Sequence, residues 1–157
     1  MLTEYTAPGE SVEVGDDESI YSLLTGRIAR TGEDTVIAER KTAPGQWMKV
    51  TTGEFHKDVI AAAKGLIAFG IAKGNAVTIF STTRYEWGVL DFALAAIGAV
   101  NVPIYDTDSA AQAERILNDS DVKLAIADNR ERFDRLDSVI DRCPSLKHIL
   151  MLDSNAM

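Results

Sequence analysis

The sequence is poor in the residues from which catalytic and metal sites are most often built. It has one cysteine, Cys143, and two histidines in 157 residues, so it offers neither a disulfide framework nor a histidine–cysteine metal cluster. No segment matches G-x-x-x-x-G-K-[ST] or G-x-G-x-x-G, the glycine-rich loops that hold nucleotide phosphates. No serine, histidine and acid stand at a spacing typical of a nucleophilic triad. The sequence therefore predicts no catalytic residue and no metal ligand.

Long apolar runs and excess positive charge are also missing. No stretch approaches the roughly 20 apolar residues that span a bilayer, and the first residues lack the basic and apolar regions of a secretory signal. Together with the lone cysteine, this predicts a cytoplasmic protein without a membrane span. The net charge of −8 repels nucleic acid phosphates. The negative net charge does not exclude binding of a small anion by a few local arginines, because nearby charges outweigh the net charge at contact distance.

A strand–helix–strand unit in residues 76–105 is the clearest pattern in the chain. Apolar residues run almost without interruption from 77 to 80, which is typical of a central strand covered on both faces. Between residues 85 and 97 the apolar side chains recur every three or four positions, which indicates a buried-face helix. A second strand follows, limited by Pro103. The unit predicts a right-handed parallel crossover.

The flanking segments predict the remaining elements of the fold. Residues 1–16 are expected to form a loosely tied arm, and Asp16 or Asp17 is expected to cap the first helix. We expect a helix over 17–31, a β-hairpin of strands 36–41 and 47–51, helices over 52–69, 110–118 and 130–142, and strands 123–127 and 148–152. The predicted fold class is α/β: a doubly wound, mostly parallel sheet with flanking helices and an N-terminal β-hairpin.

Three segments carry a resemblance to a known family: Thr83-Arg84-Tyr85-Glu86-Trp87, Ala93 through Ala99, and Val102-Pro103-Ile104-Tyr105-Asp106-Thr107. They resemble the N-terminal part of adenylate-forming enzymes, the acyl-CoA synthetase and luciferase superfamily, and within it the bacterial long-chain fatty acid–CoA ligases. The resemblance extends from about residue 17 to residue 153. The chain departs from the family at Thr83, where asparagine is usual, and at Asp106, where proline is usual.

The resemblance implies a parent enzyme of fatty acid metabolism that uses ATP, Mg²⁺ and CoA to join a long-chain acid to CoA. The family's phosphate loop and its C-terminal domain with a lysine lie downstream of the region matched. Residues 17–157 are thus expected to be the N-terminal subdomain of a longer ligase. By itself this part is expected to be inactive and to bind no cofactor tightly. The alternative is a free-standing, non-catalytic α/β binding or interaction module.

The expected partners of this subdomain are the remainder of its own chain and, in the parent, the fatty acid and CoA. An apolar docking patch is expected on Phe92, Leu94 or the final strand, and it predicts dimerisation when left uncovered. The parent is expected to associate with membranes only peripherally.

The same resemblance implies a set of CoA contacts at the carboxyl end of the predicted sheet. These are Tyr105, Asp106 and Thr107 after one strand and Arg130, Arg132 and Arg135 after the next. Arginine forks suit phosphates, and ligands normally bind at this end of a parallel sheet. The alternative places the arginines on an exposed helix face, where they pair with Glu131, Asp134 and Asp137.

Arg84 and Glu86 form a second group, at the predicted junction between the central strand and its helix. Residues two positions apart do not share a helix face, so no local salt bridge is expected between them. We expect them to fix the junction and to pack against the rest of the parent.

Overall fold

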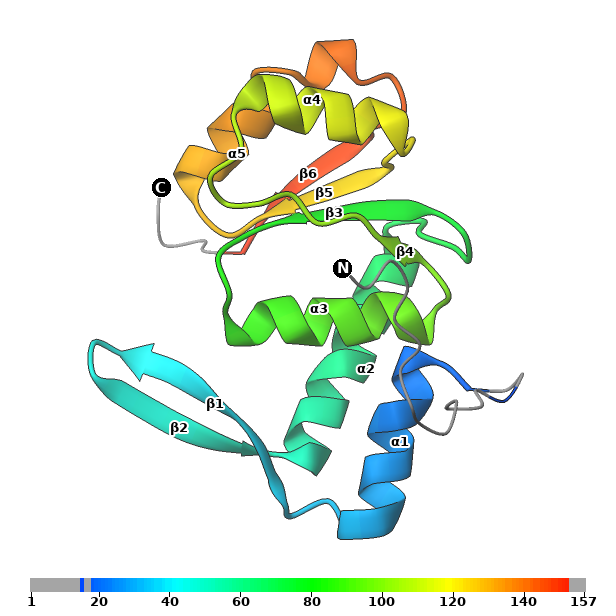
Figure 1. Ribbon diagram of the computed structural model, residues 1–157, viewed down its shortest axis with the longest axis vertical. Helices are drawn as coiled ribbons and strands as arrows, with labels where there is room; N and C mark the ends of the chain where they lie inside the picture. The colour runs from blue at the N-terminus through cyan, green and yellow to red at the C-terminus, as the bar shows by residue number, and fades with distance from the viewer. Residues whose placement is uncertain (1–14, 16–17, 153–157) are drawn as a thin grey trace, which may run out of the picture.

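The computed structural model describes residue 15 and residues 18–152 (Figure 1). Its elements follow in the order α1 (Ile20–Thr31), β1 (Val36–Ala43), β2 (Gln46–Thr51), α2 (Thr52–Ala68), β3 (Ala76–Phe80), α3 (Tyr85–Ala96), β4 (Val100–Asn101), α4 (Ala110–Asp119), β5 (Leu124–Ala127), α5 (Arg130–Asp137), the 3₁₀ turn η1 (Ile140–Arg142) and β6 (His148–Met151). Apart from Gly15, the expected N-terminal arm lies outside the described residues, as do Asp16 and Asp17. None of the helices in the described ranges is long and apolar enough to cross a bilayer.

The strands form a four-stranded sheet in the order β4-β3-β5-β6 and a separate two-stranded hairpin, β1-β2. Every pairing in the larger sheet is parallel, and the hairpin is antiparallel. All five residues of β3 are buried, as predicted for a central strand. β4 holds only two residues. Pro103 follows soon after; on either side of it, Val102 N donates to Val77 O (2.9 Å) and Ile104 forms an isolated bridge with Phe80.

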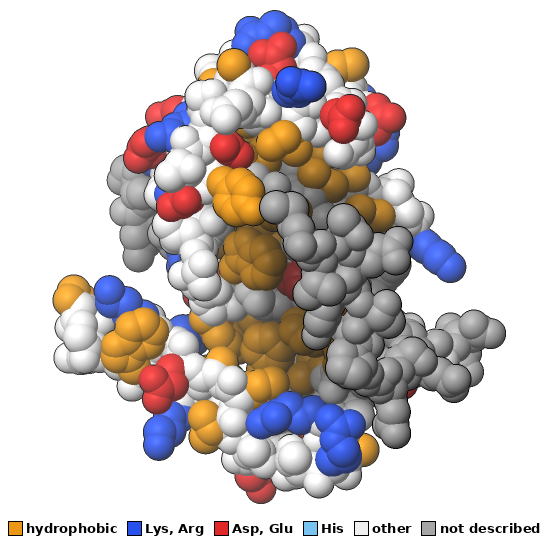
Figure 2. Space-filling view, in the orientation of Figure 1, with side chains coloured by type: hydrophobic (Ala, Val, Ile, Leu, Met, Phe, Trp, Pro, Cys, Tyr) orange, Lys and Arg blue, Asp and Glu red, His pale blue; other side chains and the backbone are white. Residues whose placement is uncertain are grey.

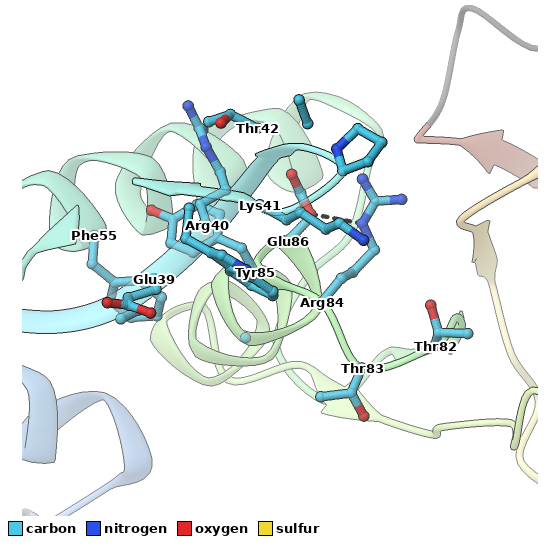
Figure 3. A pocket seen from close by; sticks show the side chains of 15 residues that line it. Glu39, Arg40, Lys41, Thr42, Phe55, Thr82, Thr83, Arg84, Tyr85 and Glu86 are labelled. Carbon is cyan, nitrogen blue, oxygen red and sulfur yellow. Dashed lines mark hydrogen bonds and ion pairs between the residues drawn. The ribbon is translucent and has the colours of Figure 1, made fainter. Parts of the chain in front are cut away.

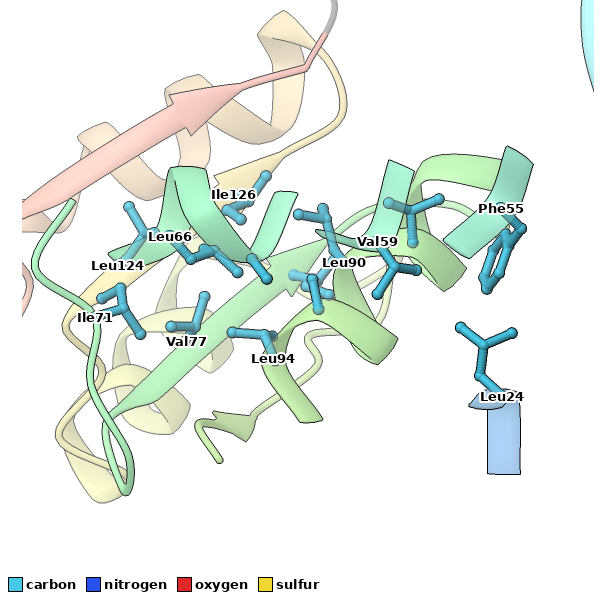
Figure 4. Packing of buried hydrophobic residues seen from close by; sticks show 14 of the residues in the cluster. Leu24, Phe55, Val59, Leu66, Ile71, Val77, Leu90, Leu94, Leu124 and Ile126 are labelled. Carbon is cyan, nitrogen blue, oxygen red and sulfur yellow. The ribbon is translucent and has the colours of Figure 1, made fainter. Parts of the chain in front are cut away.

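The two faces of the larger sheet are covered by different helices (Figure 1). α2 and α3 pack on one face over Val77, Ile79, Leu124 and Ile126 (Figure 4). The other face carries Ala76, Phe80, Ala125 and Ala127, which pack with buried residues of α4 and α5. β3 and β5 therefore contribute alternate residues to two apolar clusters, as expected for strands with period-two side chains. The doubly wound fold class is confirmed.

Side-chain caps mark where α1, α2, α4 and α5 begin. Thr51 and Glu54 form a capping box at the start of α2: Glu54 N donates to Thr51 Oγ1 (3.2 Å) and Thr51 N donates to Glu54 Oε2 (2.8 Å). The expected cap of α1 was wrong. α1 begins at Ile20, and its cap is Ser19, whose side chain accepts from Ser22 N in a second capping box.

One further element was predicted wrongly, and one of the three places expected for the docking patch is buried. The single helix expected over 130–142 is divided, because Val139 (φ −119°, ψ −4°) leaves helical geometry between α5 and η1. Leu94 is fully buried against the sheet and therefore offers no docking surface. Phe92 is partly buried, with its ring 5.6 Å from that of Phe55.

Candidate functional site

The carboxyl ends of β3 and β5 and the residues after Ile104 meet at one edge of the sheet. We call this surface the carboxyl edge; it comprises residues 81–84, 105–109 and 128–132. Parallel strands point all their carboxyl ends the same way, so loops far apart in the sequence are brought together there.

Asp128 lies at the centre of the carboxyl edge and is only 3% exposed. Its carboxylate accepts hydrogen bonds from Ser81 Oγ (3.3 Å), Thr82 N (3.0 Å), Thr82 Oγ1 (3.0 Å) and Arg132 Nη1 (2.9 Å). Burial alone would raise the pKa of Asp128, but the two bonds from Thr82 and the Arg132 charge outweigh it and hold that pKa below its ordinary value. Asp128 is therefore ionised at neutral pH.

Arg132 connects Asp128 to a second loop. Its side chain is 11% exposed, and its Nη2 lies 3.5 Å from Asp106 Oδ2. The guanidinium also lies over the Phe80 ring, 5.8 Å from the ring centroid. Its Nε is buried and has no hydrogen-bond partner. Arg132 is thus held on one side by Asp128 and contacts Asp106 on the other.

Arg135, one turn further along α5, contacts the backbone of the same loop. Its Nη1 donates to the carbonyl oxygens of Asp106 (3.3 Å) and Asp108 (3.0 Å), and its Nη2 pairs with Glu131. The structure therefore brings Asp106 together with Arg132 and Arg135.

The remaining residues expected at this edge lie apart from that cluster. Arg130 and Asp134 pair at 2.7 Å on an exposed face of α5, as the alternative predicted. The alternative is wrong for Arg132, which is buried. Tyr105 is 80% exposed, and Thr107 is also exposed. The sequence reasoning missed Asp128, although its spacing of four from Arg132 was a readable signal.

A cavity of about 880 Å³ lies beside the carboxyl edge, between the hairpin and the start of α3 (Figure 3). Arg84 Nε and Glu86 Oε2 pair there at 2.7 Å, so the expectation of no local salt bridge was wrong. Arg84 is the extended cap residue before α3 (φ −148°, ψ 168°), and the helix-face argument does not apply to it. Burial is the larger influence on the Glu86 carboxyl and would raise its pKa, but hydrogen bonds from Arg84 and the backbone lower it overall.

Tyr85 closes the same cavity from the helix side. Its hydroxyl donates to Asp58 Oδ2 (2.8 Å), and the Arg40 guanidinium lies 5.4 Å from its ring centroid. Burial, followed by the Asp58 carboxylate, raises the pKa of Tyr85 well above its usual range. Arg40 and Arg84 thus both have partners within this chain. Within residues 15 and 18–152, no group of three or more His, Cys, Asp or Glu side chains is arranged to hold a metal ion.

Comparisons with known proteins agree with the fold and with the resemblance read from the sequence. A family model for AMP-binding enzymes matches residues 24–157. The long-chain-fatty-acid–CoA ligase FadD15 of Mycobacterium bovis is 37% identical over 139 residues, which are 88% of this chain and 23% of that protein. FadD15 of Mycobacterium tuberculosis gives the same identity and coverage. The chain thus spans less than a quarter of the length of these relatives.

Solved structures give the same result at the level of the fold. The N-terminal domain of FACL13 from Mycobacterium tuberculosis matches with a TM-score of 0.75 and 24% identity over 88% of this chain and 35% of that chain. A Mycobacterium tuberculosis fatty acyl CoA synthetase matches with a TM-score of 0.75 and 25% identity over 88% of this chain and 27% of that chain. With the family model covering nearly all the described residues, this chain belongs to the family of AMP-binding enzymes.

Proposed function

We propose that this chain is the N-terminal part of a long-chain fatty acid–CoA ligase that acts in the cytoplasm. The ligase would join a fatty acid carboxylate to AMP, releasing pyrophosphate from ATP, and then transfer the acyl group to the CoA thiol with release of AMP. The observation that carries the proposal is the 37% identity with FadD15 over 88% of this chain. ATP, Mg²⁺ and CoA belong to the whole enzyme in this proposal.

Within the ligase, residues 17–157 would form an α/β subdomain preceded by an arm over 1–16. The chain lacks a phosphate loop in its sequence. The share of the FadD15 relatives that it matches is 23%. Both facts support a scaffold role, in which the remaining chain supplies the adenylation chemistry and this part by itself is inactive.

The carboxyl edge is our proposed CoA-facing wall. Among the residues predicted there, Arg130, Tyr105 and Thr107 are exposed and can reach a ligand. Arg130 lies over the Phe133 ring, 5.6 Å from its centroid, and pairs with the exposed Asp134. Exposed pairs of this kind are worth about 0.3–0.5 kcal/mol, so a phosphate can displace Asp134. Arg132 and Asp106 contact each other and would shape the wall from behind.

The rival proposal, a free-standing interaction module, agrees less well with the surface. Large apolar side chains stay exposed, among them Leu23 (64%), Trp47 (59%) and Ile20 (52%). Figure 2 shows apolar side chains gathered across the middle of one face, between charged groups at its two ends. Gathered apolar surface marks an interaction site. In the ligase, the rest of the chain would cover this apolar surface. Dimerisation or peripheral membrane contact through the same surface would be secondary to that.

The test uses the intact protein from its native cell. Pyrophosphate exchange that depends on a long-chain fatty acid is expected, and its absence would refute the ligase assignment. Arg130→Ala is then expected to raise the KM for CoA several-fold and to leave pyrophosphate exchange unchanged. Arg115→Ala, an exposed arginine on α4, is the matched control for charge. An unchanged KM for CoA in the Arg130 variant would refute the CoA wall alone.

A further inference from the structure

The loop over residues 105–108 has few backbone contacts of its own with the sheet. Its last ladder contact is the bond from Ile104 N to Ile79 O (3.2 Å). Beyond that, it closes on itself, because Asp108 N donates to Tyr105 O (2.9 Å) and Tyr105 N donates to Asp108 Oδ2 (3.2 Å). These bonds give the loop its turn but do not fix the turn relative to the rest of the carboxyl edge.

The contacts that fix its position come from α5. Arg135 donates to two carbonyl oxygens of the loop, those of Asp106 and Asp108. Arg132 reaches the Asp106 carboxylate at 3.5 Å. The two arginines are three positions apart and lie on neighbouring parts of one helix face. Helix α5 thus contacts both the backbone of the loop and the side chain of one loop residue, Asp106.

Asp128 in turn fixes Arg132. It accepts a bond from Arg132 Nη1 and three bonds from Ser81 and Thr82, so α5 is tied to the loop after β3 as well. The pair is deeply buried, with Asp128 at 3% and Arg132 at 9% exposure. A buried ion pair is often no more stabilising than apolar residues of similar volume. The Asp128–Arg132 pair is therefore better explained by the geometry that it fixes than by its contribution to stability.

We propose that Arg135, Arg132 and Asp128 are positioning residues that hold the loop over 105–108 in place at the CoA wall of the intact ligase. The inference rests on the proposed function. The Nη1 and Nη2 atoms of both arginines contact acceptors within the chain, whereas Nε of Arg132 is buried without a partner. They act through the loop, and the exposed Tyr105 and Thr107 are the groups that they place.

Arg135→Ala in the intact ligase is the primary test, because this side chain is partly exposed and its removal leaves the buried pair intact. Hydrogen exchange measured by mass spectrometry without CoA is expected to be at least several-fold faster in the peptide over 105–108. The KM for CoA is expected to rise several-fold while the KM for ATP and fatty-acid-dependent pyrophosphate exchange stay unchanged. Arg135→Lys is expected to recover part of both effects. Arg115→Ala should change neither.

Each alternative outcome identifies what fails. If exchange in 105–108 is unchanged in Arg135→Ala, the inference is overturned, even where the KM for CoA rises, since the arginine would then bind the ligand directly. If exchange speeds up and the KM for CoA does not change, the loop has no part in CoA binding and the inference is again overturned. Missing pyrophosphate exchange in the unaltered protein refutes the proposed function itself. Asp128→Asn provides a second variant, for which the same pair of changes is expected.

Discussion

Two glycines of α2 give a sharp test of the packing between this helix and the segment before the hairpin. Gly65 is exposed, and a Cβ added there would meet no atom within 4 Å. Gly53 is buried in the first turn, and a Cβ there would lie 2.9 Å from Glu33 Cβ and 3.4 Å from the Glu33 carbonyl oxygen. The same substitution to alanine is therefore expected to have opposite effects at the two positions.

The magnitudes follow from these surroundings. Gly65→Ala should raise the free energy of unfolding by about 0.5–1 kcal/mol, because glycine is costly within a helix. Gly53→Ala should lower it by about 1–3 kcal/mol, the usual cost of overpacking. Glu33 Cβ is attached to the backbone and cannot rotate away. The clash also strains the bond from Gly53 N to Glu33 O (2.9 Å) and the neighbouring bond from Thr52 N to Thr35 O (2.8 Å).

Urea unfolding at fixed pH measures both variants, and the midpoint should move in opposite directions with the slope unchanged. In a domain of this size, each kcal/mol corresponds to about 2–4 °C in the melting temperature. Equal stabilisation by the two substitutions would show that the close approach of Glu33 to α2 does not exist.

Three further predictions concern individual ionisable groups. Asp128→Asn should destabilise the protein by about 3–5 kcal/mol at neutral pH, since it removes the buried carboxylate that pairs with Arg132 and leaves that charge the more exposed Asp106 at 3.5 Å. Because the pKa of Asp128 is lowered in the folded state, its contribution to the free energy of unfolding is present above the unfolded pKa of about 3.9 and is lost as pH falls through the folded pKa. The free energies of unfolding of the unaltered protein and of Asp128→Asn should therefore converge in acid. Tyr85→Phe should leave the phenolate absorbance gained up to about pH 10 unchanged, since burial and Asp58 keep the Tyr85 hydroxyl protonated there; a smaller absorbance gain would contradict this. Cys143 is 2% exposed and burial raises its pKa, so a thiol reagent should label it at least ten-fold more slowly in native protein than in denaturant, and equal rates would refute its burial.

The central elements could be predicted from the sequence because their signals are local. The capping box of α2 and the apolar run of β3 each specify one element within a few residues. The division between α5 and η1 could not be predicted in this way. Leu136, Val139, Ile140 and Cys143 have the spacing of one continuous helix face, yet the structure interrupts the helix at Val139 (φ −119°, ψ −4°).

The location of the candidate site could be predicted from the sequence, but the contacts of its individual arginines could not. The strand ends located Asp106 and Arg132 at one edge, and the structure puts them in contact. In the sequence, however, Arg130, Arg132 and Arg135 look alike on a charged helix. What separates them is the position of Asp128 at the end of a buried strand, where it captures the one arginine that lies above it. Which arginine pairs with Asp128 depends on how deeply the end of β5 lies beneath α5, and a local sequence pattern does not contain that information.

The division of β5 between two apolar clusters also favours one alignment of this strand. A strand with one wet face resists slipping by one residue, because the slip would expose its apolar side. Here both faces of the strand are buried, so polarity cannot distinguish the native alignment from one slipped by a residue. Size does so instead: the branched residues of β5, Leu124 and Ile126, face α2 and α3, whereas its alanines face α4 and α5. A slipped strand would leave voids on one side and crowding on the other, so exchanging large and small residues here would damage strand alignment before it damaged burial.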